Sequence, residues 1–230
     1  MSRAHAFLAL LAASVAALCT GFTSPAQAAP PSYVFDGGTA NEQSQVTQAL
    51  AASSFDWSLI GQQITVHIGD YEGDYAVPGQ VYLDASLLDS GTFAWGTVLH
   101  EFGHQVDFAL LNDTERAQLN TALGGTVWTY AESPTPLQHD QYGCERFASE
   151  LAWAYWPSAE NSMSPRSIGV EADGMPPSQF RALLAQILGQ PSLAGAASAT
   201  TTTTAAGAPV TTPPAPVAKH VSLKATRRRG

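Results

Sequence analysis

The longest helical pattern in the chain, "TFAWGTVLHEFGHQVDFALL" over 92–111, most constrains what this sequence can fold into. Large apolar residues recur in it at helical spacing, which predicts a helix with one face in a hydrophobic core. We expect Thr92 to cap the first turn. The apolar face consists of Trp95, Val98, Leu99, Phe102, Val106 and Leu110.

Three polar residues interrupt this apolar run. Residues four apart lie on the same face of a helix, so His100 and His104 can present both imidazoles to one point, as a tetrahedral Zn²⁺ requires. Glu101 is turned about 100° from His100 and can stand beside the metal as a general base that takes a proton from an activated water. A charged Glu101 would be costly to bury here without a partner. The pattern is the HExxH motif of zinc metallopeptidases.

A catalytic zinc needs a third protein ligand, and the next strongly helical segment offers two candidates. This segment is "CERFASELAWAYW" over 144–156, ahead of Pro157. Glu145 and Glu150 are five residues apart and point about 140° apart on a helix, so only one of them can face the metal. Helical periodicity does not decide between them.

"HEFGHQVD", followed some forty residues later by "ERFASELAWAY", resembles the catalytic domain of the anthrax lethal factor-like metallopeptidases, a group that includes the Pro-Pro endopeptidases. The resemblance covers roughly 95–156 and implies a zincin-like fold and peptide hydrolysis. It places the third zinc ligand on Glu145, which leaves Glu150 as a solvated residue or as a partner of Arg146. Ser149 stands where the family has a second glutamate, so the chain departs from the family in whatever that glutamate supports, such as the orientation of a histidine ligand.

The resemblance also implies groups that face the substrate. The family has a tyrosine shortly before the ligand helix whose hydroxyl can stabilise an oxyanion, and Tyr142 is the candidate here, with His139 as the alternative. "GQVYLD" resembles the edge strand that pairs with an extended substrate in zincins, so a protein or peptide substrate would lie along 80–84. Asp107 is expected either to orient an imidazole or to pair with a neighbouring loop.

The remaining pattern predicts the fold class. A helix is expected over 41–54, strands over 62–70 and 81–86 with a turn-rich segment over 70–80 between them, and further helices over 113–123 and 176–189. Strands precede helices instead of alternating with them. We therefore expect an α+β fold with a small mixed sheet and an edge strand, followed by the active-site helix and a C-terminal helical part.

Both ends of the chain differ in composition from the middle. The start has a short polar segment, a long apolar run and "AQA", which predicts a signal peptide over 1–28. The segment 191–230 is rich in Thr, Ala and Pro with a basic end, which predicts a disordered tail and leaves one domain over 33–190. We expect a secreted, extracellular monomer that does not insert stably into a membrane. The basic end of the tail could bring this monomer to the cell surface.

Charge and cysteine content narrow the functional classes. The segment 33–190 holds four arginines and all nineteen acidic residues, a formal charge of −15, which argues against nucleic acid as a partner. Cys144 alone remains after signal removal, so the domain cannot form an internal disulfide. We expect a secreted zinc-dependent endopeptidase. The alternative is a secreted binding module with a structural zinc, closed by His139 or Cys144 as a fourth ligand.

Overall fold

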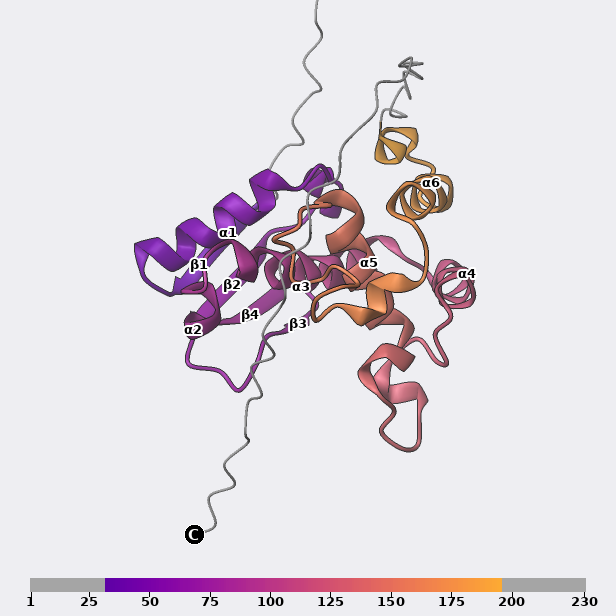
Figure 1. Ribbon diagram of the computed structural model, residues 1–230, viewed down its shortest axis with the longest axis horizontal. Coiled ribbons are helices and arrows are strands. Elements are labelled where there is room, and N and C mark those ends of the chain that lie inside the picture. Colours follow the sequence, from indigo (N-terminus) through magenta and orange to yellow (C-terminus); the bar gives the residue numbers. More distant parts are fainter. Residues whose placement is uncertain (1–31, 196–230) are drawn as a thin grey trace, which may run out of the picture. The chain divides into compact units, whose positions relative to one another are not determined.

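The computed structural model describes residues 32–195, which form six α-helices and one four-stranded sheet (Figure 1). The strand order is β1-β2-β4-β3. The first two pairings are parallel and β3 runs antiparallel to β4, so the sheet is mixed. This confirms the expected α+β class. The strands are β1 (Tyr33–Gly37), β2 (Ile64–Gly69), β3 (Tyr75–Val77) and β4 (Gln80–Asp84).

Helices account for most of the rest of the described chain. Several begin at side-chain caps: Thr39 and Glu42 form a capping box on the first helix, and Asn112 and Glu115 form one on the fourth. The helices are α1 (Ala40–Ala52), α2 (Ala85–Leu88), α3 (Thr92–Leu110), α4 (Asp113–Leu123), α5 (Gly143–Tyr155) and α6 (Pro177–Ile187).

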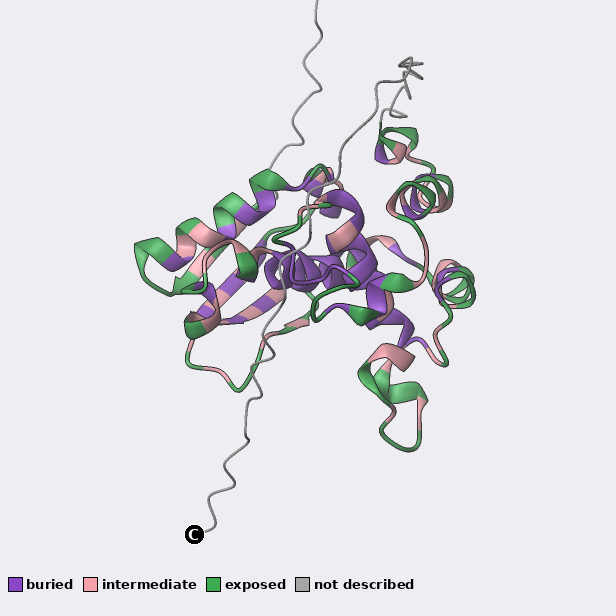
Figure 2. Cartoon of the chain, viewed as in Figure 1, coloured by how far each residue is buried: buried purple, intermediate pink, exposed green. Residues whose placement is uncertain are grey.

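The core lies on one face of the sheet. Strand residues alternate between buried and more exposed, as in Ile64, Val66 and Ile68 of β2 against its other positions. The buried set joins Val46 of α1 and Phe102 of α3 in one hydrophobic cluster. Figure 2 shows burial concentrated on α3 and α5 at the centre of the domain. Helix α3 is thus surrounded by other elements, and this is why it can be apolar on most of its circumference.

The sheet differs from expectation in ways that bear on the site. Strand β1 was not predicted, and β3 lies within the segment expected to be only turns. The strand expected at the edge, β4, is interior, because β2 and β3 hydrogen-bond to its two sides. The two edge strands are β1 and β3 instead. The strand expected over 81–86 ends at Asp84, because residues 85–88 form α2.

Two smaller expectations were also wrong. Gly91, not Thr92, is the N-cap of α3, and it makes no side-chain cap bond. The domain continues past residue 190, because 191–194 form a 3₁₀ turn whose Leu193 is buried and accepts a hydrogen bond from the Tyr155 hydroxyl at 2.9 Å.

The expected signal peptide over 1–28 and the tail from 196 onward lie outside the described residues. Within 32–195, no helix is both long enough and apolar enough to cross a membrane.

Candidate metal centre

Helix α3 holds His100, Glu101 and His104 in the protein core. Each is at most 8% exposed. The Nε2 atoms of the two histidines are 3.2 Å apart, as their four-residue spacing predicts. Two imidazole nitrogens at this distance need either a proton, shared as a hydrogen bond, or a cation between them. A metal ion bound by both nitrogens would meet this need.

A glycine allows α5 to approach this point. A Cβ atom on Gly103 would lie 3.0 Å from the Cα of Ala148, so the backbones of α3 and α5 meet at a position where only glycine fits without displacement. Ala148 is three residues after Glu145 and lies on the same face of α5. The contact at Gly103 thus fixes how far Glu145 stands from the histidines.

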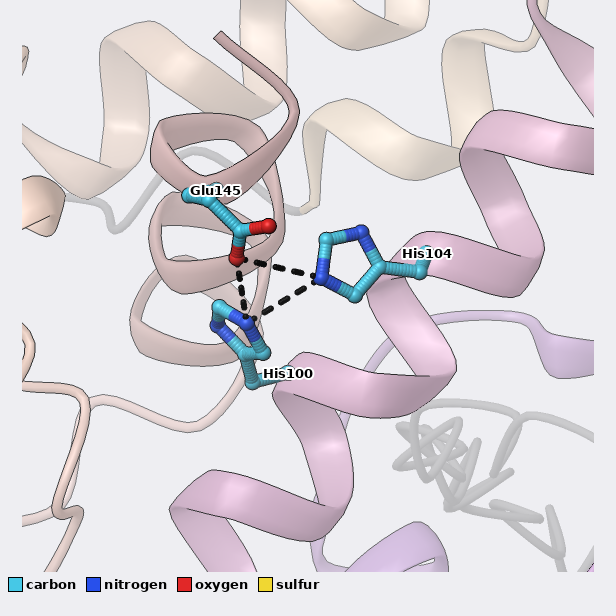
Figure 3. A group of neighbouring side chains, drawn as sticks. All are labelled: His100, His104 and Glu145. Atoms are coloured by element: carbon cyan, nitrogen blue, oxygen red, sulfur yellow. Dashed lines mark hydrogen bonds and ion pairs between the residues drawn. The ribbon is translucent and has the colours of Figure 1, made fainter. Parts of the chain in front are cut away.

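Glu145 completes a three-residue group (Figure 3). Its Oε2 is 3.1 Å from Nε2 of His100 and 3.3 Å from Nε2 of His104. One donor atom from each residue lies within 4.8 Å of the others, and all three side chains are buried. Such a group could hold a metal ion.

Electrostatics in the group agree with a bound positive charge. Burial raises the pKa of Glu145, but hydrogen bonds with His100, His104 and His139 outweigh it and bring the pKa below its usual value. Burial lowers the pKa of His104, and Glu145 more than reverses this. Burial raises the pKa of Glu101. Its Oε2 is buried and has no hydrogen-bond partner among the described residues, so the carboxylate is not tied to another side chain.

Ser149 supports the first histidine. Its Oγ lies 3.0 Å from Nδ1 of His100 and therefore constrains the orientation of the ring. This residue stands where the resembled family has a glutamate. A hydroxyl one turn after Glu145 thus contacts the imidazole directly, a contact that the sequence alone did not suggest.

Glu150 has a different environment from the one expected. It is fully buried, neither solvated nor paired with Arg146, and its Oε1 accepts a hydrogen bond from the backbone N–H of Met175 at 2.7 Å. Burial raises its pKa to about 8. Arg146 instead contacts the carbonyl of Asp140 and the carboxylate of Asp173. Glu150 therefore fastens the 174–175 segment to α5 and lies outside the three-residue group.

Asp107 pairs with neighbouring segments and not with an imidazole. Its carboxylate accepts hydrogen bonds from Nε of Arg116 at 2.7 Å and from Nε1 of Trp128 at 3.1 Å. Of the two roles considered for this residue, the structure favours the pairing role. Asp107 joins α3 to α4 and to the loop that follows α4.

A cleft of about 400 Å³ opens onto the metal-binding group. The free edge strand β3 contributes Tyr75 and Ala76 to one wall, and the 129–131 segment contributes Tyr130. His139 and Phe108 also line the cleft. The cleft thus runs beside β3, whereas the strand predicted to border it, β4, has no free edge.

Tyr142 does not fit the role of a donor to the substrate. It is 2% exposed, does not line the cleft, and its hydroxyl accepts a hydrogen bond from the N–H of Leu137 at 2.9 Å. The ring of Tyr130 stacks on it at 3.9 Å and faces the cleft in its place. Burial and the nearby Glu145 carboxylate raise the pKa of Tyr130. Sequence reasoning missed Tyr130 because it lies fifteen residues before Glu145.

His139, the alternative donor, does line the cleft. Its Nε2 is 3.2 Å from Oε2 of Glu145, and its Nδ1 is 2.7 Å from Oε1 of Glu171. Hydrogen bonds with these two carboxylates raise the pKa of His139 to about 10.

No protein-family model, curated protein or solved structure matches this chain.

Proposed function

We propose that this protein is a secreted zinc-dependent endopeptidase. One observation carries the proposal: a buried group of two imidazoles and one carboxylate borders a cleft, with the unpaired carboxylate oxygen of Glu101 beside it. The proposed extracellular location rests on the signal-like sequence of residues 1–28.

The donor set favours zinc over magnesium and calcium. Two histidines and one carboxylate form a ligand set common at catalytic zinc, whereas magnesium and calcium prefer oxygen ligands alone. His100, His104 and Glu145 would hold the ion, and Ser149 would support His100. When bound, zinc supplies Lewis-acid polarisation of the water and of the substrate carbonyl.

The chain's own residues perform the proton transfers in this proposal. Glu101 accepts a proton from the attacking water, and its elevated pKa brings its basicity closer to that of a useful general base. Glu101 then passes this proton to the departing amine as the peptide C–N bond breaks. The oxygen of the attacking water stays in the new C-terminal carboxylate of the product. His139 and Tyr130 line the cleft next to Glu145 and are the hydrogen-bond donors that we assign to the oxyanion that develops on the substrate carbonyl.

An extended peptide would bind along β3. A substrate strand added to a free edge gains main-chain hydrogen bonds and projects alternate side chains to opposite faces. Tyr75 and Val77 are exposed while Ala76 lies against the core, so the edge itself alternates in this way. This moves the proposed binding strand from 80–84 to 75–77.

The alternative function is a binding module with a structural zinc. A structural site requires four protein ligands. Sγ of Cys144 is 3.6 Å from Oε1 of Glu145, the oxygen that does not face the imidazoles, which argues against Cys144 as a fourth ligand. Nε2 of His139 does approach the group, at 3.2 Å from Oε2 of Glu145. The His139 side chain is 55% exposed and lines the cleft, which favours an open, catalytic site over a closed structural one.

Zinc analysis and cleavage of a peptide library test the function. We expect about one zinc per chain and a loss of kcat/KM of about 10² to 10⁴-fold in Glu101→Gln, with zinc retained. Glu160→Gln, the same change at an exposed acid, is the matched control. A wild-type protein without stoichiometric zinc would refute the metal centre. Zinc-loaded protein that cleaves no peptide would favour the structural role, and an unimpaired Glu101→Gln would refute the base assignment.

A further inference from the structure

One buried carboxylate near the cleft has no role in the proposed metal site. Glu171 lies in a 3₁₀ turn, η4 (Val170–Asp173), and is 7% exposed. Its Oε1 contacts Nδ1 of His139 at 2.7 Å, and its Oε2 is buried without a hydrogen-bond partner among the described residues. Burying a carboxylate is costly unless it is paired with a cation or a strong donor. The contact with His139 is therefore the main compensation for burying Glu171.

The same contact constrains the direction of the His139 ring. This histidine belongs to another 3₁₀ turn, η3 (His139–Gln141), and its side chain is 55% exposed, so protein packing alone leaves the ring room to rotate. The carboxylate of Glu171 binds one ring nitrogen, and the opposite nitrogen then faces the metal-binding group, 3.2 Å from Oε2 of Glu145. The ring of His139 also lies nearly parallel to that of His100, with centroids 6.3 Å apart.

The segment that carries Glu171 is itself attached to the ligand helix. Glu150 of α5 accepts the backbone N–H of Met175 at 2.7 Å, and Ala172 is buried. Helix α5 therefore places the carboxylate of Glu145 directly and the carboxylate of Glu171 through the 172–175 segment. Both are held relative to the same rigid element, as a preorganised site requires.

We propose that Glu171 is a positioning residue that holds His139 as the hydrogen-bond donor to the substrate oxyanion. The proposal rests on the proposed peptidase function and deepens it. Nδ1–H of His139 donates to Glu171, which directs Nε2–H toward the metal-binding group, 3.2 Å from Oε2 of Glu145, from a ring that lines the cleft. No bond is formed or broken by Glu171, which acts only through the imidazole.

A double-mutant cycle tests whether Glu171 acts through His139. We expect His139→Ala to lower kcat by about 10² to 10³-fold with a smaller change in KM. Glu171→Ala should lower kcat by about 10 to 100-fold. The double variant should be no slower than His139→Ala, because Glu171 has nothing left to position. Glu171→Gln should recover most of the activity, since its amide oxygen still accepts from Nδ1–H.

Controls separate this role from folding and from metal binding. Glu160→Ala removes an exposed carboxylate that does not line the cleft, and it should leave kcat unchanged. Zinc affinity, measured by chelator competition, should stay the same in the Glu171 variants. If the fold-losses of kcat in His139→Ala and Glu171→Ala multiply in the double variant, the two residues act independently and the proposal is overturned. A fall in zinc affinity with His139→Ala well beyond the roughly 10 to 100-fold expected for a lost supporting contact of Glu145 would overturn it too, because His139 would then be a ligand.

A measurement on the zinc-free protein is independent of catalysis. Nitrogen-15 NMR of the histidine rings reports whether each ring nitrogen carries a proton, and His139→Ala identifies the His139 signals. We expect a hydrogen-bonded Nδ1–H that is lost in Glu171→Ala. An unchanged His139 signal in that variant would overturn the positioning role. Zinc-loaded protein that cleaves no peptide would refute the proposed function and the donor role together, while the NMR result would still decide whether Glu171 positions the ring.

Discussion

Replacing Gly103 with alanine tests how the two ligand helices are spaced. The added Cβ would lie 3.0 Å from Cα of Ala148 and 3.3 Å from its Cβ. Ordinary contacts begin near 3.4 Å, so α5 must move by about 0.4 Å or the α3 backbone must bend. Because the first of these contacts is with backbone, no side-chain rotation can relieve it.

Two effects on stability oppose each other in this variant. Alanine is favoured over glycine inside a helix by about 1 kcal/mol. Overpacking in a dense core costs about 1–3 kcal/mol. We therefore expect a net loss of up to about 2 kcal/mol, which lowers Tm by about 2–4 °C for each kcal/mol in a domain of this size.

Zinc affinity should respond more clearly than stability. Ligand distances in a metal site tolerate about 0.2 Å, which is less than the displacement required here. Glu145 moves with α5, so we expect zinc affinity to fall by about 10-fold or more, as when a supporting contact of a ligand is lost.

The assay combines urea unfolding of the zinc-free protein with chelator competition for zinc. Ala117→Gly, at an exposed position in the middle of α4, measures the helix-propensity term without a packing contact and should leave zinc affinity unchanged. If Gly103→Ala is about 1 kcal/mol more stable than wild type with unaltered zinc affinity, the close approach of α3 and α5 does not control the site.

Three further predictions concern other residues of α5 and the cleft. Glu145→Ala should abolish tight zinc binding. Glu150→Ala should keep zinc but lose about 1–3 kcal/mol of stability, because the N–H of Met175 loses its acceptor. If the two glutamates are misassigned, chelator competition will show the greater loss of zinc affinity in Glu150→Ala, and thermal unfolding will show the greater loss of stability in Glu145→Ala. Tyr130→Phe should lower kcat by about 10-fold or more, whereas Tyr142→Phe should leave kcat nearly unchanged. Steady-state kinetics that show a greater loss of kcat in Tyr142→Phe would contradict the placement of these rings. The folded pKa of Glu150, about 8, is above its unfolded value near 4.5, so the folded state binds this proton more tightly and stability falls as pH rises between these values, by at most about 1.4 kcal/mol per pH unit. Urea unfolding from pH 5 to 8 should show that Glu150→Gln removes this decrease, and parallel curves for the two proteins would count against it.

Local periodicity was enough to predict the first half of the site. The four-residue spacing of His100 and His104 brings their imidazoles together in any regular α-helix, whatever packs around it. The bounds of the long helices followed from the same pattern, with α3 and α4 found within about a residue of expectation. The resemblance added Glu145, which periodicity could not separate from Glu150.

Tertiary contacts decided the groups around that helix. Glu145 reaches the imidazoles because Gly103 lets α5 approach, and Glu150 is captured by Met175 on the other side of the same helix. Tyr142 was a reasonable choice from its position before α5, but its ring packs inward and its hydroxyl is taken by Leu137.

The edge strand and the Glu171–His139 contact were beyond sequence reasoning for a common reason. Strand β3 has three residues in a turn-rich segment, too few to form a recognisable alternating pattern, and it exists because it pairs with β4. Glu171 lies 32 residues from His139 along the chain. The sequence by itself determined what depends on neighbours within one or two helical turns. Contacts between distant segments depend on how the whole core packs, and only the folded structure decided them.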